Sequence, residues 1–258
     1  MKIASTHLFA MAFLAMTGGT GAFALAAEPP VIGAEPQLFV DDVMIAAKLG
    51  VVRRAHACGK LAKPVLQSEM AWEQDGIDRR VYVYGTVLRD PADETFRMWY
   101  NRLGTVLFAT SDDGIRWNRP SLELVPLAGS RENNILPIHV HSPSVIFDQQ
   151  EADAAKRYKM IGSRRDGYVA AHSADGLTWK LYPKNPALSG FDTITLSQDP
   201  ITGEYLAFHK RQGDPRTKPV ARQVYLSVSD DMQHWSEPEL VMMPDDADHA
   251  QTRELEGG

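Results

Sequence analysis

The chain has 258 residues, of which 44% are hydrophobic and 23% are charged, and its formal net charge at pH 7 is −6. This composition is that of an ordinary globular protein, and it argues against a nucleic-acid-binding protein, which would carry a basic balance and a concentrated basic patch. Cys58 is the single cysteine, so no disulfide can form within the chain.

The N-terminus has the pattern of a signal peptide. A lysine follows the first methionine, an apolar stretch runs from about Leu8 to Met16, and small residues lead up to Ala27. A membrane anchor would need about 20 apolar residues, and no later segment is long and apolar enough to span a bilayer. We therefore expect residues 1–27 to be removed on export to the periplasm or beyond the cell, leaving an N-terminal arm at 28–36 and no membrane span.

A Ser-x-Asp-x-x-x-Trp run recurs three times, and its tryptophans are separated by 62 and 56 residues. Upstream of each run lie a strand pattern, an acidic turn and a second strand pattern. The second strand patterns align without a gap, so that Phe96, Tyr158 and Tyr205 are in register. Three aligned copies of one unit indicate a β-propeller, an all-β fold of four-stranded antiparallel blades. The three runs are Ser111–Trp117, Ser173–Trp179 and Ser229–Trp235.

The first repeat is expected to form strands at about 82–88, 95–101 and 105–110 and a short outer strand after Trp117. The propeller region is predicted at 37–243, with repeats at about 80–125, 138–187 and 190–243 and a polar tail at 244–258. Three blades do not close a ring, because propellers usually have about four to eight. The sequence is therefore interpreted as part of a larger, five-bladed ring; the alternative is a compact ring in which residues 37–75 form a fourth blade.

These motifs, together with the strand sequences Ser144–Asp148 and Gly203–Phe208, resemble the five-bladed propellers of glycoside hydrolase families 32, 43 and 68 and their bacterial relatives. The resemblance covers about residues 37–243. It implies a carbohydrate substrate and carboxylates at the mouth of a central funnel, acting as nucleophile or general base, as transition-state stabiliser and as general acid. The Asn-Asp-Pro-Asn and Glu-Cys motifs of family 32 are missing.

Family 32 also has an Arg-Asp-Pro motif, which Asp90 matches in sequence. However, Asp90 lies in the turn after the first strand of its repeat, where Asp148 and Asp199 lie in the other two. Aspartate in such a turn is ordinary turn chemistry, so a structural role is favoured. The aspartates and tryptophans of the three repeated runs are likewise interpreted as structural.

Strands alternate in direction, so the loops that enter each first strand share one face with the loops between second and third strands. The resemblance implies that this face holds the funnel. Asp192 stands immediately before an inner strand there and suits a general base or a transition-state stabiliser, although a solvated aspartate at a strand start is the alternative. Asp78 and Glu132, in the other entering loops, are the predicted acid–base partners.

His141 occupies a position nearly equivalent to that of Asp192. His139 and His141 form a His-x-His pair whose imidazoles point to one side of a strand, but a third metal ligand is not identifiable, so neither a metal site nor a cofactor is predicted. The predicted substrate-binding group is otherwise basic and suits an anionic or heavily hydroxylated sugar. The alternative is a set of repeated salt bridges to the acids of neighbouring blades. The residues of this group are Arg80, Arg102, Arg164, Arg211 and Lys210, with Arg165 beside them.

The favoured hypothesis is an exported glycoside hydrolase that acts on an oligo- or polysaccharide through Asp192 and either Asp78 or Glu132. Retention or inversion depends on whether the carboxylates lie roughly 5 Å or 6.5 to 9.5 Å apart. A non-catalytic propeller that binds a glycan or a protein is the alternative, because a fold does not imply a function. A sialidase-like hydrolase is a weaker alternative, since the repeated runs have one residue fewer than the usual Asp box. The oligomeric state and a cation in the channel are left open.

Overall fold

The computed structural model describes Gly33, Asp42, residues 44–45, 47–54, 56–74, 79–212 and 222–246, and Asp248. The predicted signal peptide and Asp78 lie outside these residues, as do all but Gly33 of the predicted arm and most of the predicted tail. The chain divides into two compact units, Met1–Gly59 and Lys60–Gly258. All the helices and strands of the described residues lie in the second unit, to which the following description applies.

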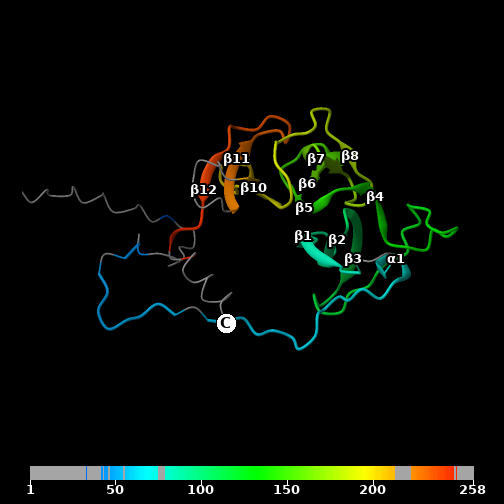
Figure 1. Cartoon of the computed structure of the whole chain (residues 1–258), viewed down its shortest axis with the longest axis horizontal. Helices are drawn as coiled ribbons and strands as arrows, with labels where there is room; N and C mark the ends of the chain where they lie inside the picture. The colour runs from blue at the N-terminus through cyan, green and yellow to red at the C-terminus, as the bar shows by residue number, and fades with distance from the viewer. Residues whose placement is uncertain are drawn as a thin grey trace, which may run out of the picture. The chain divides into compact units, whose positions relative to one another are not determined.

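The second unit contains three four-stranded antiparallel sheets, each built from strands that follow one another in the chain (Figure 1). The first sheet consists of β1 (Tyr82–Arg89), β2 (Phe96–Arg102), β3 (Thr105–Ser111) and β4 (Ile135–His139). The second consists of β5 (His141–Phe147), β6 (Tyr158–Arg164), β7 (Gly167–Ser173) and β8 (Lys180–Leu181). The third consists of β9 (Ile194–Gln198), β10 (Tyr205–Gln212), β11 (Arg222–Ser229) and β12 (Glu239–Met242).

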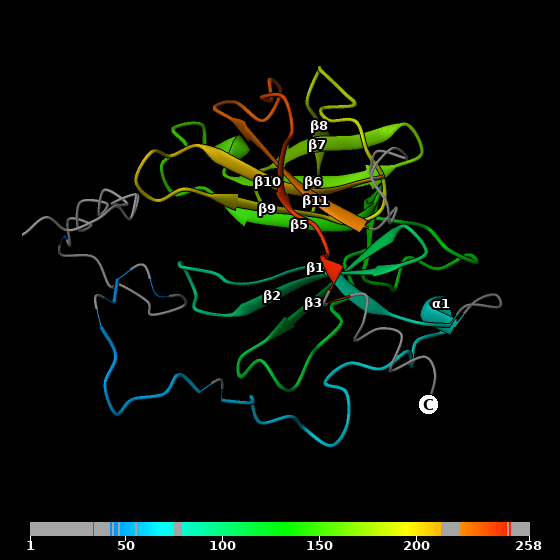
Figure 2. The same ribbon diagram turned by 60° about the vertical axis from the view of Figure 1, so that its left-hand side comes forward.

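The first strands of the three sheets lie next to one another, β1 against β5 and β5 against β9, as Figure 2 shows. Each sheet therefore presents its first strand inward and its last strand outward, which is the arrangement of propeller blades. The described residues form part of a β-propeller, as the repeats predict. The helical segments are short: α1 (Ala71–Gln74) precedes the first sheet, and the 3-10 helix η1 (Ala154–Lys156) lies between β5 and β6. No helix in the described part of the chain is long and apolar enough to cross a membrane.

The fourth strand of the first sheet differs from the prediction. The segment after Trp117 contributes only an isolated bridge between Asn118 and Thr110, and β4 begins much later in the chain, at Ile135. Pro120 lacks a backbone N–H and cannot extend the ladder at this point, so the chain leaves the sheet and returns. In the second sheet, by contrast, β8 follows Trp179 directly, as predicted.

The hydrophobic core lies between the sheets. Successive residues of a strand face opposite sides, so Trp99 packs between the first and second sheets whereas Met98 and Tyr100 pack on the other side of the first sheet, against Leu66 and Trp72. A third cluster, which includes Tyr168, Leu196 and Tyr205, fills the space between the second and third sheets. This packing holds the inner strands in fixed positions relative to one another.

The three Ser-x-Asp-x-x-x-Trp runs form the same turn. In the first, the Asp113 carboxylate accepts hydrogen bonds from the backbone N–H groups of Ile115 and Arg116, at 2.8 and 2.7 Å, and the Trp117 indole donates to the carbonyl of Gly114 at 3.1 Å. The turns at Asp175 and Asp231 repeat these bonds. Their predicted structural role is confirmed.

Two kinds of hydrogen bond recur between neighbouring sheets. The hydroxyl of Tyr158 donates to the Asp90 carboxylate of the preceding sheet, and the hydroxyl of Tyr205 donates to Asp148 in the same way. Nearer the axis, the backbone N–H of Val145 donates to the Thr86 hydroxyl at 2.8 Å, and that of Leu196 donates to Ser144 at 2.9 Å. The predicted structural role of Asp90 is thus confirmed, and its carboxylate also joins two blades.

Candidate functional site

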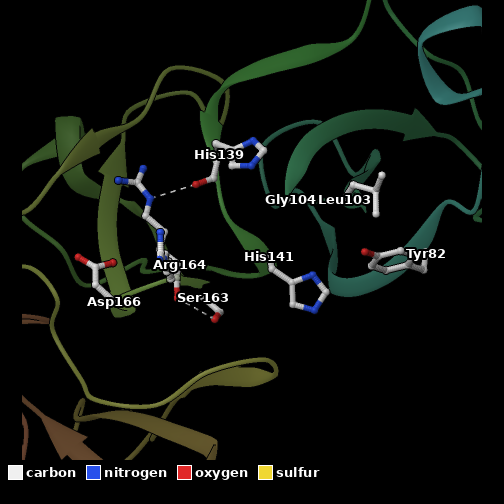
Figure 3. Close-up of a pocket in the computed structure, with 9 residues that line it drawn as sticks. Tyr82, Leu103, Gly104, His139, His141, Ser163, Arg164 and Asp166 are labelled. Carbon is white, nitrogen blue, oxygen red and sulfur yellow. Dashed lines mark hydrogen bonds between the residues drawn. The ribbon is translucent and has the colours of Figure 1, made fainter. Parts of the chain in front are cut away.

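A cleft of about 870 Å³ opens on the face where the entering loops and the loops between second and third strands meet (Figure 3). The alternation of strand direction predicts that these segments share a face. The first sheet contributes Tyr82 at the start of β1, the turn after β2, and the end of β4. The second sheet contributes the start of β5 and the turn after β6. The lining residues are Tyr82, Leu103, Gly104, His139, His141, Ser163, Arg164, Arg165 and Asp166.

Asp192 lies beside this cleft, on the segment that leads into β9, and contacts two of its lining residues. One carboxylate oxygen lies 3.3 Å from His141 Nε2, and the backbone N–H of Asp192 donates to the Ser163 hydroxyl at 3.1 Å. The other oxygen accepts a hydrogen bond from Lys210 Nζ at 2.7 Å. His141 is the first residue of β5 and Asp192 lies two residues before β9, so their positions are nearly equivalent, and the contact of β5 with β9 brings their side chains together.

Asp192 is held in the ionised form. The hydrogen bond from Lys210 lowers the pKa of its carboxyl below the ordinary value, and the bond with His141 acts in the same direction, whereas partial burial opposes them. Its side chain remains 30% exposed, so a ligand can approach it. A carboxylate that stays charged suits a general base, a nucleophile or the stabilisation of positive charge, and it does not suit a proton donor at neutral pH.

Two tyrosines, Tyr82 and Tyr84, lie next to the His141 ring. The His141 ring meets Tyr82 and Tyr84 edge-on, with ring centroids 5.9 and 5.6 Å apart. Tyr84 is 52% exposed, so aromatic surface is available next to the imidazole. An aromatic ring with a polar tip offers both apolar contact and hydrogen bonding to a ligand. Sequence reasoning missed these tyrosines, because aromatic residues at the start of a strand are typical of strands in general.

His139 and His141 extend to the same side in Figure 3, toward Gly104 and Tyr82 respectively. Gly104 has φ +83°, and a Cβ there would lie 2.8 Å from His139 Nε2, so the turn needs glycine both for its backbone and for this close approach. Within the described part of the chain, no three His, Cys, Asp or Glu side chains are grouped as the ligands of a metal ion would be.

Glu132, one of the two predicted acid–base partners, does not line the cleft beside Asp192. Glu132 lies on the segment between β3 and β4 and lines a different cleft, of about 680 Å³, together with Trp72 and Arg79. Asp78 is outside the described residues. Among the described residues that line the larger cleft, Asp166 is the one carboxylate.

The predicted basic group is distributed over several places. Arg164 lines the cleft, and its Nε donates to the carbonyl of His139 at 3.0 Å (Figure 3). Arg102 donates in an equivalent way to the carbonyl of Glu73, also at 3.0 Å. Arg211 lies over the Tyr225 ring, 5.5 Å from its centroid, and Arg80 is exposed just before β1. Arg102, Arg164 and Arg211 keep equivalent positions in β2, β6 and β10, but the contacts described above differ from one arginine to the next.

Lys210 has a role that sequence reasoning did not assign. Its ammonium group lies against Asp192 and over the ring of Phe191, 4.7 Å from the ring centroid, and its contact with substrate stays a prediction. A lysine in this place stabilises the charge of a carboxylate. The pairing depends on β10 following β9 in one sheet, which places Lys210 next to the segment that carries Asp192.

No protein-family model matches the chain, and no curated protein matches it. Solved structures similar to it include a thermostable family-43 glycoside hydrolase, at 18% identity over 62% of this chain and 52% of that one, with a TM-score of 0.46. They also include a single-residue mutant of the Cellvibrio cellulosa α-L-arabinanase, at 12% identity over 72% of this chain and 68% of that one, also with a TM-score of 0.46.

A β-fructofuranosidase from Schwanniomyces occidentalis is similar as well, at 14% identity over 61% of this chain and 33% of that one, with a TM-score of 0.44. The chain thus spans about half of the family-43 structure and a third of the fructofuranosidase. These structures are glycoside hydrolases, the class that the sequence motifs resemble, and the likeness concerns the fold alone.

Proposed function

We propose that the chain is an exported, carbohydrate-active protein of the glycoside hydrolase type, and that Asp192 is its principal carboxylate. The observation that carries the proposal is the group of Asp192, Lys210 and His141, which keeps an accessible carboxylate ionised beside a cleft that Tyr82 lines. Such a carboxylate can attack the anomeric carbon, activate a water molecule or stabilise the oxocarbenium-like transition state.

Hydrolysis of a glycosidic bond also needs a group that protonates the leaving oxygen. Asp166, on the turn after β6, is the candidate that lines the cleft, and it is exposed. Asp78 remains a second candidate, and Glu132 a third that would act only if substrate spanned both clefts. Lys210 keeps Asp192 charged during the reaction, and His141 orients it from the side of the cleft.

The test is hydrolysis of aryl glycosides and of plant and algal polysaccharides by the full chain and its Asp192→Asn variant. We expect the variant to lose about 10²–10⁴-fold in kcat, the usual contribution of a group that acts in acid–base catalysis. Asp153→Asn is the matched control, because Asp153 is exposed and caps η1 away from the cleft. Hydrolysis that proceeds at the same rate in Asp192→Asn would remove Asp192 from the reaction.

A non-catalytic glycan-binding propeller is the second candidate. It is favoured by one observation: hydrolysis uses a pair of carboxyl groups, but among the described residues that line the larger cleft Asp166 is the one carboxylate, since Asp192 lies beside the lining and not in it. Binding to an array of glycans without turnover of any of them would select this function. Loss of that binding in a Tyr82→Ala variant would place it in the same cleft.

We also infer that residues 1–27 direct export and are then removed, because the lysine, the apolar stretch and the small residues before Ala27 occur in the order of a signal peptide. The N-terminal sequence of the protein recovered from the secreting cell should begin at Ala27 or Glu28. A mature protein that retains Met1 would contradict this inference.

A further inference from the structure

We propose that the sugar bound in this cleft is acidic, and that its carboxylate or sulfate group binds to Arg164 and Arg165. The inference rests on the proposed function, since it names the class of sugar that the same site accepts. It goes further by assigning a recognition role to two arginines that take no part in holding Asp192.

The first support is the balance of charge in the cleft. Its described lining residues include two arginines, two histidines and one acid, Asp166. The whole chain has the opposite balance, with 33 acidic residues against 27 lysines and arginines. Basic groups gathered in a concave site of an acidic protein produce a local positive potential that attracts anionic ligands.

The second support is the state of the two guanidinium groups. Neither arginine forms an ion pair with a carboxylate in the described part of the chain, although both belong to a protein with an excess of acids. Arg164 uses its Nε to donate to the carbonyl of His139, which fixes the plane of the group and leaves its terminal nitrogens for a ligand. A fixed guanidinium fork matches carboxylate and sulfate oxygens and loses little entropy when it binds them.

The third support is that Asp192 does not cancel this positive charge. Its carboxylate is paired with Lys210 at 2.7 Å and lies 3.3 Å from His141. The catalytic carboxylate is thus compensated by a lysine from β10, and the arginines on the turn after β6 remain for an anion. An acidic sugar therefore meets little repulsion from Asp192.

The arrangement also indicates how the sugar lies. Figure 3 shows His141 between Arg164 and Tyr82 in that view, so the cleft has a basic side and an aromatic side. A pyranose ring against Tyr82 and His141 would extend its acidic substituent toward the turn that carries Arg164 and Arg165. The aromatic side gives affinity for any sugar, and the basic side gives the preference for an acidic one.

The test is a saturation-transfer NMR titration of the full chain with three ligands that share one ring: methyl β-D-glucuronide, methyl β-D-glucoside 6-sulfate and methyl β-D-glucoside. We expect one or both acidic ligands to bind about tenfold more tightly than the neutral one at low ionic strength. The preference should shrink when salt is raised to about 0.15 M, where charges are screened over about 8 Å. Comparing the two acidic ligands distinguishes a carboxylate from a sulfate.

The variants Arg164→Gln and Arg165→Gln should abolish the preference for the acidic ligands. Arg116→Gln is the matched control, because the Arg116 side chain is 90% exposed and lies on the turn after β3. Equal binding of all three ligands, or binding of none, would overturn the inference, as would an equal loss in Arg116→Gln. Hydrolysis of neutral polysaccharides that Asp192→Asn abolishes would then still support the proposed function, so the two failures can be told apart.

Discussion

Asp148 and Asp199 occupy the same turn in neighbouring sheets, but their surroundings differ. Both accept hydrogen bonds from the backbone N–H groups two and three residues later in the chain. Asp148 is 2% exposed and also binds the Tyr205 hydroxyl of the next sheet, with Lys159 at 3.6 Å. Asp199 has only its local bonds among the described residues.

This difference shows that the turn is formed by its own residues and that the neighbouring sheet adds the burial. A carboxylate that a turn has already fixed in place becomes a blade-to-blade contact wherever the next sheet presents a tyrosine. The same holds nearer the axis, where Thr86 and Ser144 accept bonds from the following sheet and the equivalent Thr195 is exposed.

The sharpest way to test the comparison is to remove each aspartate. We expect Asp148→Ala to lower the free energy of unfolding by about 3–5 kcal/mol, because it leaves the buried Lys159 ammonium with less compensation and the Tyr205 hydroxyl without an acceptor. Asp199→Ala should cost about 0.5–1.5 kcal/mol, the value of ordinary hydrogen bonds. Urea unfolding of the full chain measures both, and similar losses in the two variants would show that the local turn alone determines stability.

The tyrosine side of the contact can be tested alone. Tyr205→Phe should cost about 1.5–3 kcal/mol, the range for a hydrogen bond to a charged group, and Tyr158→Phe should cost a similar amount because it donates to Asp90 in the same way. Tyr84→Phe is a suitable control. Because Tyr84 is 52% exposed, this substitution should change the free energy of unfolding by no more than about 0.5 kcal/mol. If Tyr205→Phe lowers the free energy of unfolding by no more than this control does, the comparison is contradicted.

Much of the fold follows from local patterns in the sequence. The alignment of Phe96, Tyr158 and Tyr205 located the second strand of each sheet, and the repeated Ser-x-Asp-x-x-x-Trp turns marked the end of each third strand. The bond from Tyr205 to Asp148 could not be predicted in this way, because it joins residues 57 positions apart and depends on how two sheets pack. The position of β4 was missed for a related reason. Its pairing with β3 is non-local, because residues 112–134 separate the two strands in the chain.

The candidate site was predictable only in part. The equivalence of His141 and Asp192 was visible in the sequence, and the contact between β5 and β9 brings the two side chains together. Lys210 was recognised as a basic residue of the right loop, yet its partner could not be known without the register of β9 and β10. Tyr82 gave no signal, because an aromatic residue at a strand start is typical of strands in general.

The inner contacts offer a smaller test of the same comparison. Thr86→Val removes the acceptor of the Val145 N–H, and we expect it to cost about 1–3 kcal/mol because a partly buried donor is left unpaired. Thr195→Val, at the equivalent position of the third sheet, should change stability by less than about 0.5 kcal/mol. Thermal and urea unfolding of the two variants measure these changes. A larger loss of unfolding free energy in Thr195→Val than in Thr86→Val would contradict the comparison.

The smallest expected effect is a change in the acid dependence of stability. Burial alone would raise the pKa of Asp148, but the hydrogen bond from Tyr205 and the bond from the Gln150 N–H outweigh it, so the pKa in the folded protein lies below the ordinary value of 3.8. A group with a lowered folded-state pKa contributes stability that is complete above the unfolded-state pKa and disappears as the pH falls through the folded-state pKa. Asp148→Asn should therefore differ most from the wild type above about pH 4, and the difference should narrow as the pH falls through the folded-state pKa of Asp148. Tyr205→Phe removes one of the causes, so its unfolding free energy should fall less steeply than that of the wild type as the pH falls below about 4. An unchanged acid slope in Tyr205→Phe would mean that the turn, rather than the neighbouring sheet, keeps Asp148 ionised.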